Sequence, residues 1–101
     1  MPKSTNLKVP KQKIADFCRK NNIKKLSLFG SVLRDDFSQG SDVDVLVEFD
    51  PNHIPGLSFF GMQDELSEIL GRNVDLHTPG FLSPYFRDKV LTEAEVRYVA
   101  P

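Results

Sequence analysis

The stretch from residue 42 to residue 49, DVDVLVEF, constrains the fold most, because apolar and polar side chains alternate along it. Its three valines fall on one face of an extended chain, whereas Asp42 and Asp44 fall on the other. This two-residue period predicts a β-strand with one face packed against a core. The chain is therefore expected to build a β-sheet around residues 42–49.

The segments on either side of this strand carry the periods of further helices and strands. Helices are expected over 10–22, 59–71 and 84–91, strands over 24–29, 73–77 and 96–99, and a short helical turn followed by a loop over 31–40. Gly71 is placed to end the second helix, and Ser83 is placed to cap the third. The order of elements predicts an α/β, or α+β, fold with one small mixed β-sheet flanked by helices.

The length and composition fit one ordinary globular domain. The sequence has 101 residues, 40% of them hydrophobic and 27% charged, and no repeat or linker, so residues 1–101 are expected to form a single domain. Cys18 is the only cysteine, which excludes an internal disulfide and a four-thiolate zinc site, and we interpret it as core packing. Because no run of about 18 apolar residues occurs, a membrane span is not expected, and the chain is expected in the cytoplasm.

The charge balance limits the kinds of partner. A net charge of −1 gives no general attraction to a polyanion, so strong nucleic-acid binding is not expected. Lysine and arginine gather before residue 26, and we interpret this cluster as a solvated helix face, with a nucleic-acid patch as the alternative. Any nucleotide must therefore be held by a local site.

One such site is indicated where the predicted strand 24–29 ends in Gly30 and Ser31. A glycine at a strand end permits unusual backbone dihedral angles and a close approach of ligand to backbone. The turn that follows aims backbone N–H groups outward, which suits a phosphate, and the Ser31 hydroxyl can donate to a phosphate oxygen. Arg34, one turn beyond, is placed either for a phosphate contact or for the solvated surface.

Carboxylates follow at a spacing that suits divalent cations. Asp42 and Asp44 project from the same face of their strand, and Asp75 lies in the later predicted strand 73–77. Such oxygen ligands suit Mg²⁺, and two metal ions about 4 Å apart would bind both the attacking and the leaving oxygen of an in-line displacement. Asp75 is expected to ligate the second metal or to take the proton of an acceptor hydroxyl.

The pattern of Gly-Ser, then Asp-x-Asp, then an aspartate on a later strand resembles the signature of DNA polymerase beta-like nucleotidyltransferases. The wording LFGSVLRDDFSQGSDVDVLVEF, followed by VDLHTPGFLSP, is similar to the MNT proteins, the minimal members that are often paired with HEPN-domain proteins. The resemblance extends from about Leu26 to Tyr98 and so implies the polymerase beta-like fold for most of the chain.

The resemblance also implies a reaction and a partner. It implies transfer of AMP from Mg²⁺-bound ATP to a tyrosine of a HEPN ribonuclease toxin, with this chain as the antitoxin and a complex of the two proteins as a further expectation. Gly30 and Ser31 would hold the triphosphate, and Asp42, Asp44 and Asp75 would be the metal-binding and catalytic carboxylates. Two alternatives stay open: neutralisation of the toxin by complex formation alone, and transfer to a small molecule such as an aminoglycoside.

Several other residues allow two interpretations. His77 shares a strand face with Asp75, so it either borders the acceptor site or faces solvent at a strand end. His53 is interpreted as surface. The apolar residues of the second helix, Phe59, Phe60, Met62, Leu66 and Ile69, are interpreted as core, whereas Phe81, Tyr85 and Phe86 belong either to the core or to a partner surface.

Overall fold

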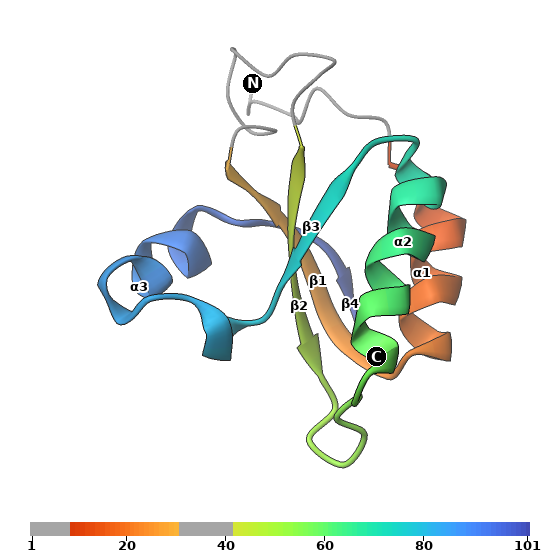
Figure 1. The fold of residues 1–101 in the computed structure, drawn as a ribbon, viewed down its shortest axis with the longest axis horizontal. Helices are drawn as coiled ribbons and strands as arrows, with labels where there is room; N and C mark the ends of the chain where they lie inside the picture. Colours follow the sequence, from red (N-terminus) through yellow and green to blue (C-terminus); the bar gives the residue numbers. More distant parts are fainter. Residues whose placement is uncertain (1–8, 31–41) are drawn as a thin grey trace.

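Alternating apolar side chains organise one mixed β-sheet. The computed structural model describes residues 9–30 and 42–101, and within them four strands lie in the order β3-β2-β1-β4 (Figure 1). The strands are β1 (Ile23–Phe29), β2 (Val43–Phe49), β3 (Val74–His77) and β4 (Glu95–Val99). β1 is antiparallel to both β2 and β4, whereas β2 and β3 are parallel. The predicted small mixed sheet is therefore confirmed.

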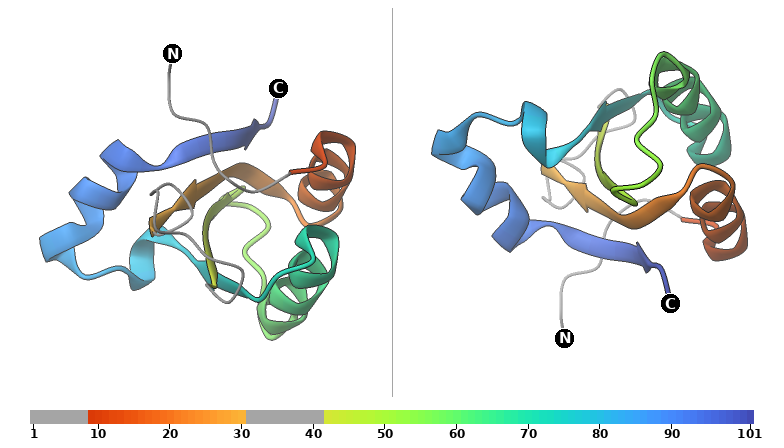
Figure 2. Two further views of the ribbon diagram at one scale, coloured as in Figure 1. Left: turned by 90° about the horizontal axis from the view of Figure 1, so that it is seen from above. Right: turned by 90° about the horizontal axis from the view of Figure 1, so that it is seen from below.

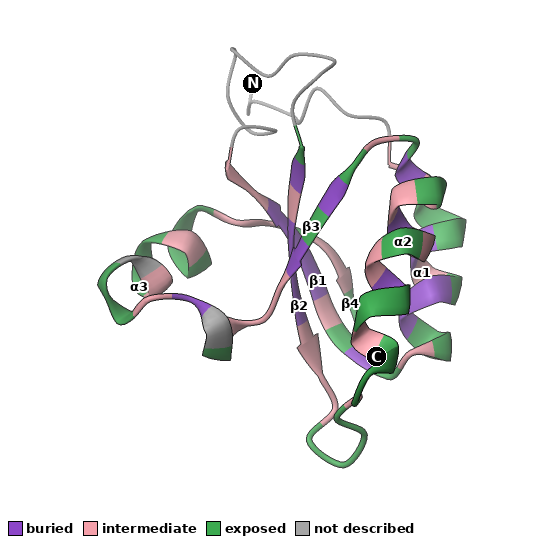
Figure 3. Ribbon diagram, viewed as in Figure 1, coloured by how far each residue is buried: buried purple, intermediate pink, exposed green. Residues whose placement is uncertain are grey.

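The helices divide between the two sides of this sheet. α1 (Lys11–Lys20) and α2 (Ser58–Leu70) lie next to each other on one side, and α3 (Pro84–Glu93), which follows the short 3-10 helix η2 (Pro79–Phe81), lies away from them (Figure 2). The three valines of β2 are fully buried, as their alternation predicted (Figure 3). They pack in one core with residues of both helices: Ile14, Phe17, Cys18, Met62, Leu66 and Leu70.

The ends of the helices follow the predicted local chemistry. Gly71 ends α2 in the left-handed conformation at φ 68°, which glycine adopts readily because it has no Cβ atom. The Ser83 hydroxyl accepts a hydrogen bond from the Tyr85 N–H and so caps α3. Pro10 directly precedes α1 as its cap residue, and the predicted helical turn within 31–40 lies outside the described residues.

The outer edge of β3 is held by side chains of α2. The backbone N–H of Val74 donates to Ser67 Oγ at 3.1 Å, and the N–H of Leu76 donates to Gln63 Oε1 at 3.0 Å. Strand groups that would otherwise be open for pairing with another chain are thus satisfied within the fold. These bonds lie on either side of Asp75 in the sequence and fix the position of its backbone.

The structure corrects one predicted core position, Phe60, and decides between the two interpretations of Tyr85. Phe60 is 68% exposed, because the buried stripe of α2 runs through Met62, Leu66 and Leu70 and Phe60 lies off that stripe. Tyr85 on α3 is 98% exposed and therefore belongs to the surface. The side chains of Phe81 and Phe86 lie outside what the structure describes. Among residues 9–30 and 42–101, no helix has the length and apolar character that a membrane crossing requires.

Candidate functional site

The parallel pairing of β2 and β3 brings two of the predicted carboxylates together. Asp44 and Asp75 are direct register partners across the two strands. Their neighbours on β2 and β3, Val43, Val45, Val74 and Leu76, are all buried in the core. Because side chains alternate along a strand, both carboxylates stand on the face away from α1 and α2. The expectation that Asp75 lies on a strand next to Asp44 is therefore confirmed.

His77 completes this cluster. Its Nε2 atom lies 3.5 Å from Oδ1 of Asp44, which is longer than a normal hydrogen bond, and its ring meets Phe29 edge to face at 5.2 Å between centroids. Nε2 is buried, and no described residue offers it a hydrogen bond. Single ligand atoms of Asp44, Asp75 and His77 all lie within 4.8 Å of one another. Of the two interpretations of His77, the structure supports a place beside the acidic site.

Asp42 stands at the margin of the site. It directly precedes β2, which begins one residue later than predicted, and its side chain is exposed. Its negative charge acts on Asp44, but within the described part of the chain it is not one of the three residues whose ligand atoms converge. The role of Asp42 as a metal ligand stays a prediction.

The surroundings of Asp44 favour its neutral form. Partial burial raises the pKa of Asp44 above its ordinary value, and the charges of Asp75 and Asp42 raise it further. His77 opposes these effects and lowers the pKa of Asp44. A carboxyl group in such a place is ionised most easily when a cation is bound beside it.

Gly30 is fitted to the Asp44 carboxylate. It directly follows β1, whose last residue, Phe29, pairs with Asp44, and its φ is 77°, in the left-handed region. A Cβ atom at position 30 would collide with Oδ2 of Asp44. The glycine therefore serves both the backbone conformation and the close approach of strand end to carboxylate. The neighbouring predicted phosphate contacts, Ser31 and Arg34, lie outside the described residues.

The kinds of ligand atom in this cluster indicate that it fits a metal cation. Two carboxylates and an imidazole nitrogen that has no hydrogen-bond partner among the described residues form a group that can hold a divalent cation. Bringing the carboxylates together without a cation costs free energy through their mutual repulsion. The site is thus suited to a divalent cation beside a glycine turn.

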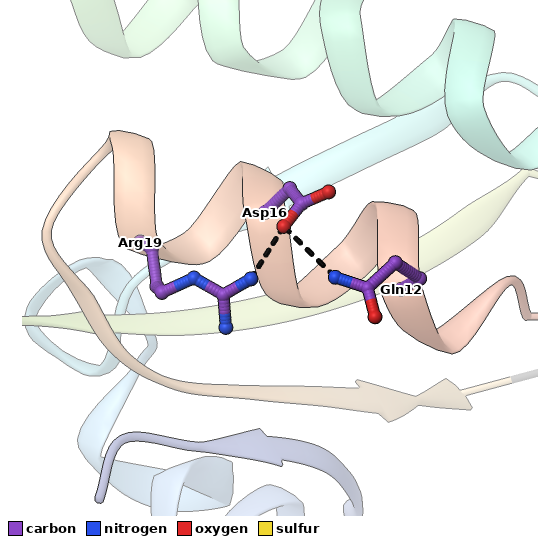
Figure 4. A network of polar contacts seen from close by, with 3 residues as sticks. All are labelled: Gln12, Asp16 and Arg19. Atoms are coloured by element: carbon purple, nitrogen blue, oxygen red, sulfur yellow. Dashed lines mark hydrogen bonds and ion pairs between the residues drawn. The ribbon is translucent and has the colours of Figure 1, made fainter.

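Several polar residues outside the cluster lie on the surface, and Cys18 lies in the core. Asp16 of α1 accepts hydrogen bonds from Gln12 at 3.0 Å and from Arg19, all on the exposed side of the helix (Figure 4). This arrangement agrees with a solvated helix face. His53 is exposed, as predicted, and its Nδ1 atom lies 3.6 Å from Oδ2 of Asp50. Cys18 is buried in the core, and this burial raises the pKa of its thiol to about 12.

Comparison with curated proteins finds relatives along most of the chain. A Methanocaldococcus jannaschii protein that is named as a candidate protein adenylyltransferase is 36% identical over 89 residues, which are 88% of this chain and 95% of that protein. The Thermococcus cleftensis protein adenylyltransferase MntA is 35% identical over 72 residues, which are 70% of this chain and 71% of its own length.

Two solved structures share the fold of this chain, and a match to a protein-family model shows its family. A toxin-antitoxin structure with AMP-PNP gives a TM-score of 0.72 at 21% identity and covers 91% of this chain and 75% of its own. A chain from the complex of a tri-AMPylated Shewanella oneidensis HEPN toxin with MNT antitoxin gives a TM-score of 0.64 at 22% identity. The match covers 89% of this chain and 70% of that chain. The nucleotidyltransferase domain family matches residues 11–96, and this chain therefore belongs to that family.

Proposed function

We propose that this chain transfers AMP from ATP to a hydroxyl group of a HEPN-domain toxin and thereby acts as its antitoxin. The observation that supports this most is the pairing of Asp44 with Asp75 beside the Gly30 turn. Relatives named as protein adenylyltransferases support the choice of donor and of a protein acceptor. The likeness to a chain from an AMPylated HEPN toxin complex supports the choice of partner.

In this proposal, Asp42, Asp44 and Asp75 would hold two Mg²⁺ ions, and Gly30, Ser31 and Arg34 would contact the triphosphate of ATP. When bound, the cations would neutralise charge on the phosphates and on the reacting oxygens. The acceptor oxygen attacks the α-phosphorus, a new P–O bond forms, and the bond to the bridging oxygen breaks. Pyrophosphate leaves with the electron pair of that bond, and Asp75 takes the hydroxyl proton.

The test uses ATP labelled in its adenine, Mg²⁺ and a HEPN-domain protein, which is to be sought in the reading frame next to the one that encodes this chain. Label is expected on the HEPN protein, and a tyrosine is expected to carry it. Asp44→Asn should lower the rate at least 100-fold, because a neutral amide is a poor cation ligand. Asp64→Asn is the matched control, since Asp64 is exposed on α2 away from the cluster, and it should transfer at the normal rate.

The same variants separate catalysis from neutralisation by binding. If the chain acts by transfer, the doubly substituted Asp42→Asn, Asp44→Asn protein should no longer protect cells from the toxin while still forming the complex. Full protection by this variant would show that binding alone neutralises the toxin. Absence of label from the HEPN protein with the folded wild-type chain would refute the transfer.

A further inference from the structure

The imidazole of His77 has a defined place beside the two carboxylates. The alternation of β3, VDLH, places Asp75 and His77 on one face of the sheet, next to Asp44 of β2. The backbone of His77 is in register with Leu46, and its ring meets Phe29 edge to face at 5.2 Å between centroids. Aromatic rings favour this geometry. The strand and the neighbouring ring thus orient the imidazole before any ligand is bound.

The Nε2 atom of this imidazole faces the site without a partner. It is buried, and within the described residues no group forms a hydrogen bond with it. Oδ1 of Asp44 lies 3.5 Å away, which is longer than a hydrogen bond of roughly 2.7–3.2 Å. Buried polar atoms in proteins are nearly always paired. An unpaired nitrogen that faces a group of ligand atoms therefore indicates that a ligand binds between them.

The charge around Nε2 indicates that this ligand is a cation. Single ligand atoms of Asp44, Asp75 and His77 lie within 4.8 Å of one another. A carboxylate oxygen and the unprotonated nitrogen of a neutral imidazole are both electron-pair donors, so they repel each other at short range. A cation between them attracts both atoms and removes this repulsion.

The separation of the two facing atoms also fits a shared cation. Ligand atoms about 2.1 Å from one transition-metal ion stand roughly 3 to 3.5 Å from each other at tetrahedral or octahedral angles. The distance of 3.5 Å between His77 Nε2 and Asp44 Oδ1 lies at the upper end of this range. Asp75 is the direct register partner of Asp44 and supplies a second carboxylate to the same group. One cation can therefore contact all three side chains.

An imidazole ligand changes which cation such a site prefers. Mg²⁺ takes oxygen ligands, and carboxylates suit it well. Divalent transition metals bind imidazole nitrogen readily, and their affinity for a mixed nitrogen and oxygen site rises from Mn²⁺ to Co²⁺. Two carboxylates together with one imidazole therefore favour a transition metal over Mg²⁺ more strongly than carboxylates alone.

We infer that His77 is a metal ligand, together with Asp44 and Asp75, and that it makes this site select a divalent transition metal over Mg²⁺. The inference rests on the proposed function for the presence of a cation at the cluster, and it specifies which cation the site takes. It adds an imidazole to the carboxylates that the sequence predicted as ligands, and it assigns His77 to the cation rather than to the acceptor.

The first experiment measures cation affinity without nucleotide or partner. Isothermal titration calorimetry at one pH gives the affinities for Co²⁺ and Mg²⁺. His77→Phe keeps a ring against Phe29 but removes both nitrogens, and it should lower the ratio of Co²⁺ to Mg²⁺ affinity by about tenfold or more. His53→Phe is the matched control, because His53 is exposed and is not in the cluster, and it should keep the wild-type ratio.

The second experiment observes the nitrogen atom directly in the wild-type chain, so it does not depend on the folding of a variant. The chain is labelled with nitrogen-15 in its two histidines, His53 and His77, and saturated with Zn²⁺. Binding of a metal to an imidazole nitrogen moves the NMR signal of that nitrogen. The Nε2 signal of His77 is expected to move to the position of a metal-bound nitrogen, whereas the signals of His53 should stay in place.

Two results would overturn the inference. One is an unmoved Nε2 signal of His77 in the Zn²⁺-saturated chain. The other is an equal loss of Co²⁺ and Mg²⁺ affinity in His77→Phe, which would mean that His77 only orients Asp44. Transfer of AMP to the HEPN protein is measured separately. A chain that binds Zn²⁺ through His77 but transfers no AMP would contradict the proposed function alone, and a chain that transfers AMP with His77 unbound would contradict this inference alone.

Discussion

At the scale of single residues, the site depends on a contact between a backbone and a carboxylate. Gly30 and Asp44 are so close that a Cβ atom on the glycine has no room. The sequence predicted that this glycine is needed, but for the phosphate of a ligand. The structure adds a second reason, the carboxylate of β2, and this reason depends on the β1–β2 register, which a linear motif does not contain.

Gly30→Ala is expected to reduce nucleotidyl transfer strongly, because the new methyl group must displace the Asp44 carboxylate. The positive φ should add a stability cost of about 1 kcal/mol. Gly71→Ala is the matched control, since Gly71 has a φ of 68° but no atom near the added Cβ. Urea unfolding should show similar losses for both, and the transfer rate should fall only for Gly30→Ala. Equal activity of the two variants would refute the role of the contact.

The raised pKa of Asp44 predicts how the site responds to acid. In cation-free protein, burial and the neighbouring charges should make Asp44 take up its proton at a higher pH than an ordinary aspartate. Cation affinity should then weaken as the pH falls into that range. Carbon-13 NMR of the carboxyl group measures the titration directly. In Asp75→Asn the midpoint of the Asp44 titration should move to lower pH, because one of the negative charges that raise the pKa of Asp44 is removed. An unchanged midpoint would contradict this electrostatic account.

At the scale of helices and strands, local patterns predicted most of the architecture. The valine alternation of β2, the glycine end of α2 and the serine cap of α3 all lie where the sequence indicated. Phe60 was assigned to the core wrongly, and Tyr85 was left undecided, because the position of an aromatic residue in a helix does not by itself tell which side of that helix the sheet covers. The bonds from α2 to β3 were not foreseen, since they join residues that become neighbours only in the folded chain.

These bonds predict a stability role for Gln63. Replacing it by leucine keeps the side-chain size but leaves the Leu76 N–H without its acceptor, which should cost about 1–3 kcal/mol. Gln12→Leu is the comparison, because Gln12 is exposed on α1 and its partner among the described residues is the exposed Asp16, so its loss should cost less than about 0.5 kcal/mol. Chemical denaturation of both variants gives the difference. A Gln63→Leu protein as stable as Gln12→Leu would show that water replaces the lost acceptor.

At the scale of the whole molecule, the sheet gathers residues from distant parts of the chain into one site. Gly30 directly follows β1, Asp44 lies on β2 and Asp75 lies on β3. The connection between the parallel strands β2 and β3 includes the whole of α2. The sequence predicted the carboxylates because Asp-x-Asp follows a Gly-Ser turn and precedes an aspartate on a later strand, a combination that resembles the nucleotidyltransferase signature. It could not decide the place of His77, because this place depends on the register of β3 against β2.

Such a site should lower the free energy of unfolding of the cation-free protein, because the fold holds carboxylates close together before any cation is bound. Since the pKa of Asp44 is raised on folding, the folded chain binds the proton more tightly than the unfolded chain, and stability falls as the pH rises through this range. At neutral pH, Asp44→Asn should therefore stabilise the cation-free protein, by about 1 kcal/mol.

Mg²⁺ or Mn²⁺ at a hundredfold excess over its dissociation constant should stabilise the wild type by about 2.7 kcal/mol and Asp44→Asn much less. Thermal unfolding with and without cation measures both effects. A wild type that gains nothing from cations, with a destabilised Asp44→Asn, would mean that Asp44 supports the fold rather than a cation.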